Sequence, residues 1–263
     1  MTFPHGKHKV LTMSYDDGRT ADRRLVRMFN EYQIKGTFHI NSGLLDTGDH
    51  ISSRELKDLY QGHEVSAHTF THPTIARSPR EEILAEIMDD RRHLERLVGY
   101  CVRGLSYPNG SFNRKIKEML PYLGIEYART VHSTGNFSMP DDFFEWNPTC
   151  HHTHKLMELA ESFASLHKKQ YVYMMYVWGH SYEFDSDNSW GTMESFCKLI
   201  SNREEIWYAT NVEIADYLNA FSSLRFSASS DFVYNPSVIS VWLTVEGRNV
   251  EVKGGATVQL DTM

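Results

Sequence analysis

The chain has 263 residues and a mass of 30.5 kDa, enough to bury a large core within one domain. Hydrophobic residues make up 41 % and charged residues 23 % of the chain, as is typical of a globular protein. The formal net charge is −7 at pH 7 and no Lys/Arg-rich run stands out, so neither nucleic acid nor a membrane is expected as a partner.

Short apolar runs alternate with amphipathic helical stretches through residue 222. The expected strands are 9–15, 35–41, 63–68, 101–108, 124–129, 171–179 and 205–210. The expected helices are 20–33, 52–61, 78–99, 153–166 and 211–221, with Ser78 and Asn211 as N-caps of two of them. This alternation predicts an α/β fold with right-handed crossovers and a mainly parallel sheet or barrel, in which functional groups gather where strands end.

The pattern changes after Phe221. The following residues alternate with a period of two, interrupted by the turn signals NPS, EGRN and KGG, and predict a small antiparallel β extension. We therefore expect two domains, a (β/α) unit at 1–222 and the extension at 223–263. The extension is interpreted as a lid or a partner surface rather than a sugar-binding module. Its apolar strands are compatible with a homodimer.

The N-terminal sequence and the cysteines bear on location. MTFPHGKHKVLTMSYDDG has no apolar stretch long enough for a signal peptide, and no segment could span a bilayer. Cys101, Cys150 and Cys197 are widely spaced and form no C-x-x-C pair. We therefore expect a reduced, cytoplasmic location.

Two adjacent carboxylates, Asp16 and Asp17, end the first expected strand in SYDDG. Successive strand residues point to opposite faces, so both can share a site only if the chain turns there, which Gly18 allows. His68 and His72 follow the third expected strand in HTFTHP, and one helical turn would place both imidazoles on one side. Two imidazoles and one carboxylate, with a position open to water, are typical of catalytic zinc. One aspartate would then bind the metal, and the other would take a proton from water.

Two further strand ends carry candidate groups. The turn at 108–110 exposes backbone N–H groups that could face an oxyanion, or it is an ordinary turn entering a helix. His180 ends the longest apolar strand and is a candidate general acid. Of the three acidic residues beyond it, one is expected to orient this histidine and the others to lie in a solvated loop: Glu183, Asp185 and Asp187.

These segments, in this order, resemble the polysaccharide deacetylase (NodB-homology) group, carbohydrate esterase family four. SYDDG corresponds to the family motif T-F-D-D-G and HTFTHP to H-[ST]-x-x-H-P, and the resemblance spans roughly residues 8–220. It implies a distorted, incomplete (β/α) barrel and a divalent metal, with zinc, cobalt and nickel all suited to the ligand set. It further implies a hydrolase that removes N-acetyl groups from an amino-sugar-containing polysaccharide or oligosaccharide and releases acetate.

The resemblance also assigns roles to individual residues. It implies a metal site formed by three ligands: Asp17, His68 and His72. It implies three catalytic groups, namely the general base Asp16, the general acid His180, which protonates the leaving amine, and the backbone N–H of Asn109 as oxyanion donor. Three aromatic residues near the corresponding motifs are expected to bind the substrate: Tyr107, Trp146 and Trp178.

The sequence departs from the family motifs at several points. In the third motif, R-x-P-[YF]-G, Ser106 replaces the arginine and Asn109 the aromatic residue. Arg103 lies three residues before Ser106, and whether it supports Asp16 is left open. The fourth motif, D-x-x-D-W, is approximated by DFFEW at 142–146, and the last motif reads VWGH.

The segment CHHTH at 150–154 also carries metal-binding residue types. Cys150, His152 and His154 would lie close together in an extended chain. We interpret the segment as a rim loop that leads into the next helix, because no matching ligand pair is evident elsewhere in the sequence.

Two other functions stay open. The first is a related metal-dependent amidohydrolase that acts on a small non-sugar or cyclic amide, which a cytoplasmic location, the altered third motif and Trp178 would suit. The second is a non-catalytic sugar-binding relative that uses the barrel and the β extension. The intact Asp, His and His set speaks against it, because a binder needs no base beside a metal-ligand aspartate.

Overall fold

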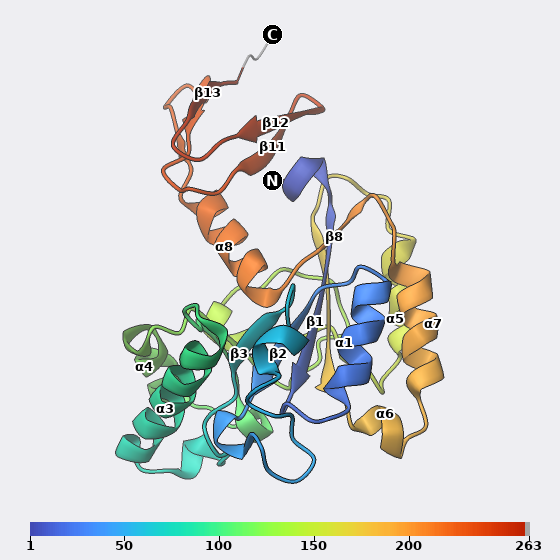
Figure 1. Cartoon of the computed structure of the whole chain (residues 1–263). Coiled ribbons are helices and arrows are strands. Elements are labelled where there is room, and N and C mark those ends of the chain that lie inside the picture. Colours follow the sequence, from blue (N-terminus) through green and yellow to red (C-terminus); the bar gives the residue numbers. More distant parts are fainter. Residues whose placement is uncertain (261–263) are drawn as a thin grey trace.

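A parallel β-sheet forms the centre of the computed structural model, which describes residues 1–260 (Figure 1). The sheet has eight strands in the order β5-β4-β3-β2-β1-β7-β6, and β8 pairs with β1. In chain order they are β1 (Lys9–Asp16), β2 (Gly36–Ile40), β3 (Glu64–Ala67), β4 (Gly104–Ser106), β5 (Tyr127–Arg129), β6 (Cys150–His151), β7 (Tyr173–His180) and β8 (Ile206–Tyr208). All ladders between these described strands are parallel, so their carboxyl ends lie at one end of the sheet.

The sheet curls into a barrel that stays incomplete. Three strands lie between β5 and β1 in the sheet, yet Arg129 at the end of β5 forms an ion pair with Asp16 at the end of β1. The chain crosses from edge strand β5 to edge strand β6 through the 3-10 helix η6 (Phe143–Glu145), where Trp146 makes one parallel bridge to Arg129. The curling therefore brings strand ends that are distant in the sheet to a common mouth.

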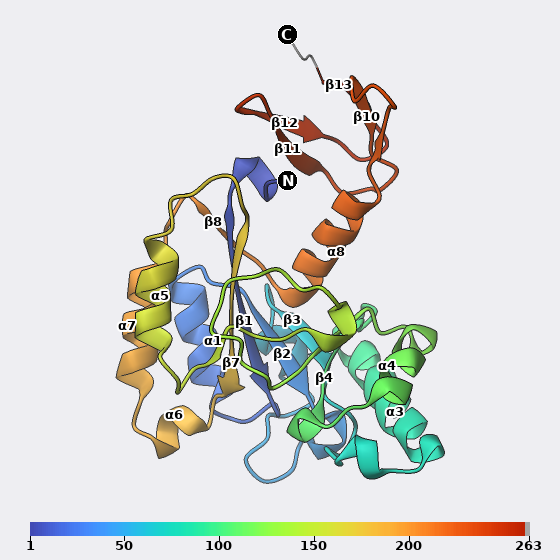
Figure 2. The same ribbon diagram turned by 180° about the vertical axis from the view of Figure 1, so that it is seen from behind.

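Helices cover the outside of the sheet (Figures 1 and 2). One flank carries α1, α7 and α5, where α7 contacts both neighbours, and the other flank carries α3 and α4. The helices are α1 (Asp22–Glu31), α2 (Leu56–Leu59), α3 (Arg80–Val98), α4 (Arg114–Met119), α5 (Leu156–Ala164), α6 (Glu183–Ser186), α7 (Trp190–Ile200) and α8 (Asn211–Ser222). Among residues 1–260, no helix combines the length and the apolar character needed to cross a bilayer.

The central strand β1 places polar residues at the mouth through its register with its neighbours. All eight of its residues are buried, as expected of a strand covered on both faces. Its register places Asp16 beside His39 of β2 and beside His180 of β7. At its other end, the buried Lys9 donates through Nζ to the carbonyl of Ala164 at 2.9 Å.

Two predicted helix caps are wrong. The N-cap of α8 is Thr210, whose hydroxyl accepts a hydrogen bond in a capping box, and not Asn211. Asn211 is fully buried, and its Oδ1 accepts from the Thr12 hydroxyl at 2.7 Å, so the side chain is not free to cap. Ser78 does not cap α3 either, because Pro79 holds the N-cap position and makes no side-chain cap bond.

The strands after α8 form two small antiparallel sheets. They are β9 (Arg225–Phe226), β10 (Phe232–Tyr234), β11 (Val241–Val245), β12 (Arg248–Val252) and β13 (Thr257–Gln259). Residues 261–263 of the predicted extension lie outside the described residues. Together with the curled parallel sheet, these strands confirm the predicted fold class.

The extension packs against the start of the chain. Both β11 and β12 contact the 3-10 helix η1 (Pro4–Gly6), and Thr2 forms a bridge with Trp242. It therefore lies beside the amino ends of the barrel strands, at the opposite end from Asp16 (Figures 1 and 2). A homodimer formed through it stays a prediction.

Candidate functional site

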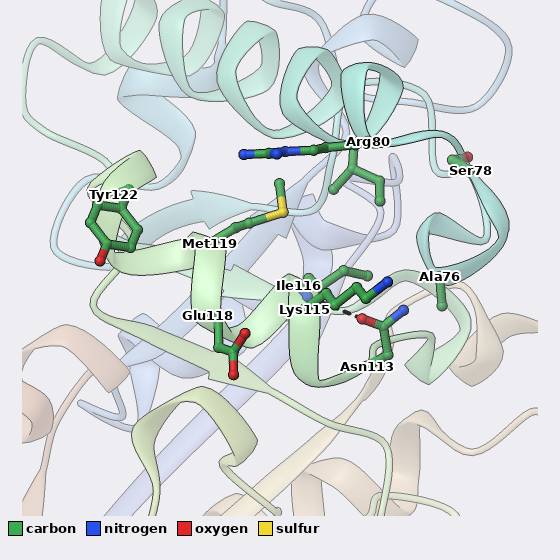
Figure 3. A pocket seen from close by; sticks show the side chains of 10 residues that line it. Ala76, Ser78, Arg80, Asn113, Lys115, Ile116, Glu118, Met119 and Tyr122 are labelled. Atoms are coloured by element: carbon green, nitrogen blue, oxygen red, sulfur yellow. Dashed lines mark hydrogen bonds between the residues drawn. The ribbon is translucent and has the colours of Figure 1, made fainter.

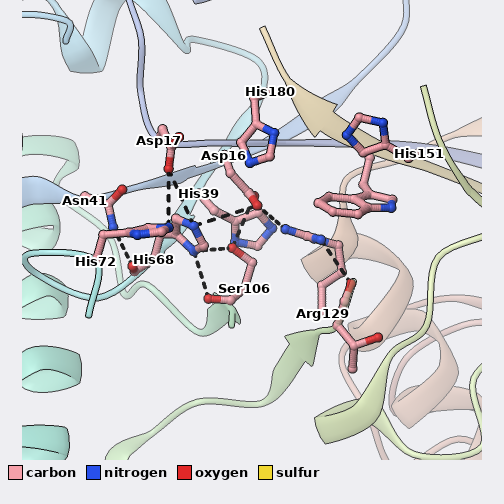
Figure 4. A network of polar contacts seen from close by, with 12 residues as sticks. Asp16, Asp17, His39, Asn41, His68, His72, Ser106, Arg129, His151 and His180 are labelled. Carbon is pink, nitrogen blue, oxygen red and sulfur yellow. Dashed lines mark hydrogen bonds and ion pairs between the residues drawn. The ribbon is translucent and has the colours of Figure 1, made fainter. Parts of the chain in front are cut away.

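Polar side chains from five strand ends gather at the mouth of the barrel (Figure 4). They come from β1, β3, β4, β5 and β7, and they are Asp16, His68, Ser106, Arg129 and His180. The sequence predicted roles for Asp16, His68 and His180. The contacts of Ser106 and Arg129 with Asp16 emerge from the structure.

Asp17, His68 and His72 form a compact set of donor atoms (Figure 4). The Asp17 Oδ1 atom lies 3.6 Å from Nε2 of His68 and 3.8 Å from Nε2 of His72. All three ligand atoms lie within 4.8 Å of one another. Ligands at about 2.0–2.1 Å from a tetrahedral ion are about 3.3 Å apart, so small inward movements suffice for these atoms to hold one metal ion.

The chain after β3 does not form the helical turn that the four-residue spacing predicted. It is a loop in which Thr69 has φ 65° and His72 has φ 64°. The left-handed region is uncommon for residues other than glycine, and such strain is found most often at functional sites. The rings of His68 and His72 meet edge to face with their centres 4.8 Å apart. The strained loop therefore brings both rings to Asp17.

Contacts with Ser106 determine which ring nitrogen of His68 carries the proton. The Nδ1 atom lies 2.9 Å from the Ser106 carbonyl oxygen and 2.6 Å from its Oγ, while this hydroxyl donates to Oδ1 of Asp16 at 3.2 Å. Because the carbonyl can only accept and the hydroxyl proton is already engaged, the imidazole proton lies on Nδ1. Burial lowers the pKa of His68, which favours the neutral ring. The lone pair of Nε2 then faces Asp17, as a metal ligand requires.

Asp16 forms a buried ion pair with Arg129. Arg129 is completely buried, and it donates through Nη2 to Asp16 Oδ2 and through Nη1 to the carbonyl of Thr130 at 3.0 Å. Its guanidinium lies 4.4 Å from the ring centre of Trp178. Burial acts to raise the pKa of Asp16, but the charge of Arg129 outweighs it and holds this pKa well below its usual range. Asp16 is therefore ionised while remaining outside the set of three donor atoms.

Arg103 does not support Asp16. It donates to both carboxylate oxygens of Asp216 at 2.7 Å and to Glu126 at 2.7 Å, next to the amino end of β4. The arginine that does contact Asp16 is Arg129, which the sequence analysis missed. The available signal was its place as the last residue of the expected strand 124–129.

His180 contacts one of the three acidic residues that follow it. Its Nδ1 lies 3.3 Å from Oε2 of Glu183, and its backbone N–H donates to the same oxygen at 3.0 Å. Burial acts to lower the pKa of His180, but Glu183 and the charges of Asp16 and Asp17 outweigh it and raise this pKa. Asp185 is engaged elsewhere, because it accepts from the indole of Trp190 at 2.8 Å.

The predicted oxyanion donor, Asn109, lies in the 3-10 helix η4 (Pro108–Gly110), directly after β4. Its φ is 56°, and its side chain is exposed and donates to Thr74 Oγ1 at 3.2 Å. The residue thus stands on the rim that also carries Ser106.

Two of the three predicted substrate-binding residues are buried and not accessible to a ligand. Trp146 is completely buried between Tyr127 and Tyr176, with ring centres 5.5 Å and 5.3 Å away. Tyr107 is 1 % exposed, and its hydroxyl donates to the carbonyl of residue 144 at 2.8 Å. Both belong to the core, so the substrate-binding prediction is not supported for them. Trp178, 9 % exposed, keeps an edge at the mouth beside Arg129.

A pocket of about 640 Å³ lies away from these groups, between the start of α3 and α4 (Figure 3). Its lining includes Arg80, Lys115 and Tyr122, but none of the predicted site residues. The candidate site is therefore defined by its donor groups and not by this cavity.

Comparison with known proteins bears on the first half of the chain. The model of the polysaccharide deacetylase family matches residues 4–128. Over this segment, just under half of the chain, the sequence is similar to the polysaccharide deacetylase family. The match includes Asp16, Asp17, His68 and His72, and the resemblance read from their motifs is confirmed. Arg129 and the later site residues lie beyond the matched segment.

Two relatives of the chain are named as deacetylases, one of chitin and one of peptidoglycan N-acetylglucosamine. The chain is 26 % identical over 143 residues to chitin deacetylase 1 of Cryptococcus neoformans var. grubii, covering 52 % of this chain and 29 % of that protein. It is 25 % identical over 109 residues to a peptidoglycan-N-acetylglucosamine deacetylase of Bacillus cereus, covering 41 % of this chain and 38 % of that protein. The chain thus spans well under half the length of these curated relatives.

A solved structure shares the fold. The family 4 carbohydrate esterase from Streptomyces lividans, determined in complex with acetate, aligns with a TM-score of 0.52 and 11 % identity. The alignment covers 76 % of this chain and 91 % of that chain. At this identity the likeness shows the fold alone.

Proposed function

We propose that this chain is a member of the polysaccharide deacetylase family and a metal-dependent hydrolase that removes N-acetyl groups from an amino-sugar-containing carbohydrate and releases acetate. The observation that carries the proposal is the arrangement around Asp16. An ionised carboxylate, held by Arg129 and Ser106, stands beside three donor atoms that can share one ion and is not itself one of them. The names of the relatives support the substrate class.

The metal site would consist of Asp17, His68 and His72. Two neutral imidazoles and one carboxylate suit zinc, and they also suit cobalt or nickel. When bound, the ion supplies Lewis acidity toward water and an acetyl carbonyl. The N–H at Nδ1 of His68 donates a hydrogen bond to the carbonyl of Ser106, which leaves the lone pair of Nε2 available to bind the ion.

Asp16 is the general base of the proposed reaction. Its carboxylate accepts a proton as a water oxygen attacks the carbonyl carbon of the N-acetyl group. Arg129 and Ser106 hold the carboxylate oxygens in place, so little reorganisation is needed at that moment. The backbone N–H of Asn109 is proposed to stabilise the oxyanion that forms on the acetyl oxygen.

His180 is the general acid. It stands beside Asp16 in the register of β1 and β7, and it is 22 % exposed at its side chain, so a substrate can reach it. It donates a proton to the amide nitrogen as the carbon–nitrogen bond breaks, which yields acetate and a free amine. Glu183 positions it by accepting from its backbone N–H and by lying against its Nδ1.

Two substitutions separate the roles of the paired aspartates and histidines. Asp16→Asn is expected to lower acetate release from N-acetylglucosamine oligomers by about 100-fold or more, as loss of a general base does, while the bound metal stays at the wild-type level. His72→Ala is expected to lose both activity and metal. Asp89→Asn, on the exposed face of α3, is the matched control and should change neither. Equal loss of metal in Asp16→Asn would contradict this division of labour.

A further inference from the structure

Three imidazole nitrogens surround one carboxylate oxygen beside the site described above. Nε2 of His151, Nε2 of His152 and Nδ1 of His180 each lie 3.3 Å from Oε2 of Glu183. Among them, the ligand atoms of His151, His152 and Glu183 all lie within 4.8 Å of one another. The ligand atoms of the first group of donors lie within the same limit, and the two groups share no residue.

His152 lacks a hydrogen-bond partner although it is buried. It is 4 % exposed, and within residues 1–260 neither of its ring nitrogens has a hydrogen-bond partner. The ring is stacked on Phe184 at 4.2 Å and on Tyr15 at 5.7 Å between centres. Buried polar groups in native proteins are nearly always satisfied, by protein, water or an ion. A carboxylate oxygen of Glu183 lies 3.3 Å from Nε2 of this ring.

Gly179 fixes the orientation of this ring. A Cβ atom at residue 179 would come within 2.0 Å of Nδ1 of His152, so only glycine leaves room for the imidazole there. The backbone N–H of His152 donates to the carbonyl of Trp178 at 2.9 Å and ties the residue to β7. Nδ1 is therefore turned to the glycine, and Nε2 is the nitrogen presented to Glu183.

The neighbouring His151 also directs its Nε2 at Glu183, 3.3 Å from Oε2. Its Nδ1 lies 2.8 Å from Oγ1 of Thr153 and also accepts a hydrogen bond from the backbone N–H of Thr153 at 3.3 Å. The ring is half-buried at the mouth of the barrel, where Figure 4 shows it near His180.

We infer that His151, His152 and Glu183 form a second metal site, of the zinc class. Two imidazoles and one carboxylate are a ligand set typical of zinc, and the ion satisfies the orphaned Nε2 of His152. The bound ion fastens the end of β6, a strand of two residues, to the first residue of α6. The sequence analysis set aside a metal site in CHHTH for want of a partner, and the structure supplies Glu183. The histidines that meet it are the second and third residues of that segment.

Counting bound ions tests this inference without any activity assay. Metal-stripped protein is titrated with Co²⁺, and binding is followed by equilibrium dialysis and by visible absorption. We expect two ions per chain in the wild type, one in His72→Ala, one in His151→Ala and none in the double variant. His154→Ala is the matched control, because this exposed neighbour lies outside the set of ligand atoms, and it should keep two.

Glu183→Gln is a second variant, which preserves the shape of the side chain and should bind one ion, like His151→Ala. Near-ultraviolet circular dichroism shows whether each variant keeps its packing. One ion in the wild type that disappears entirely in His72→Ala overturns the inference, as do two ions that persist in both His151→Ala and Glu183→Gln. One ion that persists in His72→Ala but is lost in His151→Ala supports the second site and speaks against the first.

Discussion

Replacing Arg129 by methionine removes the charge that faces Asp16 and keeps most of the aliphatic stem. The side chains of Arg129 and Asp16 are 0 % and 3 % exposed, so water cannot replace the lost partner. Two unit charges about 4 Å apart interact by about 4 kcal/mol at an effective dielectric constant of about 20. Removing one partner of a buried ion pair typically costs about 3–5 kcal/mol, because the other charge stays buried and unpaired. We expect Arg129→Met to lower the free energy of unfolding by this amount.

Urea unfolding of the metal-free protein at pH 7 measures this change. Arg103→Met is the matched control, since Arg103 also pairs with carboxylates but its side chain is 30 % exposed. Because water can reach this partly exposed pair and solvate the carboxylates left behind, Arg103→Met should lower the free energy of unfolding by clearly less than Arg129→Met does.

A double variant tests whether the cost arises from the unpaired charge. Adding Asp16→Asn to Arg129→Met removes that charge and should recover part of the loss, with a coupling energy of about 2 kcal/mol or more. Equal losses in Arg129→Met and Arg103→Met, or no recovery in the double variant, would refute the electrostatic account of the pair.

Two further predictions concern the stability contributed at buried positions. Burial raises the pKa of Glu64 from its ordinary value of 4.5 to about 7, so the folded protein binds this proton more tightly than the unfolded chain does. The stability that Glu64 contributes should therefore be fully present below pH 4.5 and fall by about 3 kcal/mol as the pH rises to about 7. The buried Asp22 and Asp90 contribute in the same direction, so Glu64→Gln should make the slope of urea-unfolding stability across this pH range shallower by about 3 kcal/mol and not abolish it. Gly179→Ala should destabilise the protein by about 1–3 kcal/mol, because the new Cβ atom would collide with the ring of His152 at 2.0 Å. An unchanged melting temperature for Gly179→Ala would contradict the packing described there.

Much of the framework could be predicted from local signals. The alternation of apolar runs and amphipathic stretches located the strands of the sheet, and the polar residues that end them marked the mouth. Asp16 and Asp17 could be recognised because the turn at Gly18 follows them directly. These features depend on residues that are close together in the sequence.

The contacts that complete the site depend on the curling of the sheet. Arg129 contacts Asp16 only because the sheet curls and brings β5 round to β1 across three intervening strands. The hydrophobic periodicity of the sequence predicts strands but not how strongly the sheet curls. Glu183 meets His151 because β6 and β7 are neighbours although helix α5 separates them in the chain. Trp146 was expected at the substrate because its motif lies near the site in the family, whereas here it is enclosed in the core.

The most direct test of the proposed function is acetate release from N-acetylglucosamine oligomers by metal-stripped and zinc-restored protein, with small acetylated and cyclic amides assayed in parallel. The account predicts acetate from the oligomers only after zinc is restored, and none from His72→Ala under the same conditions. Acetate released equally without metal would contradict the role of Asp17, His68 and His72. Zinc-loaded protein that leaves the oligomers intact, or hydrolyses only the small amides, would contradict the proposed carbohydrate substrate.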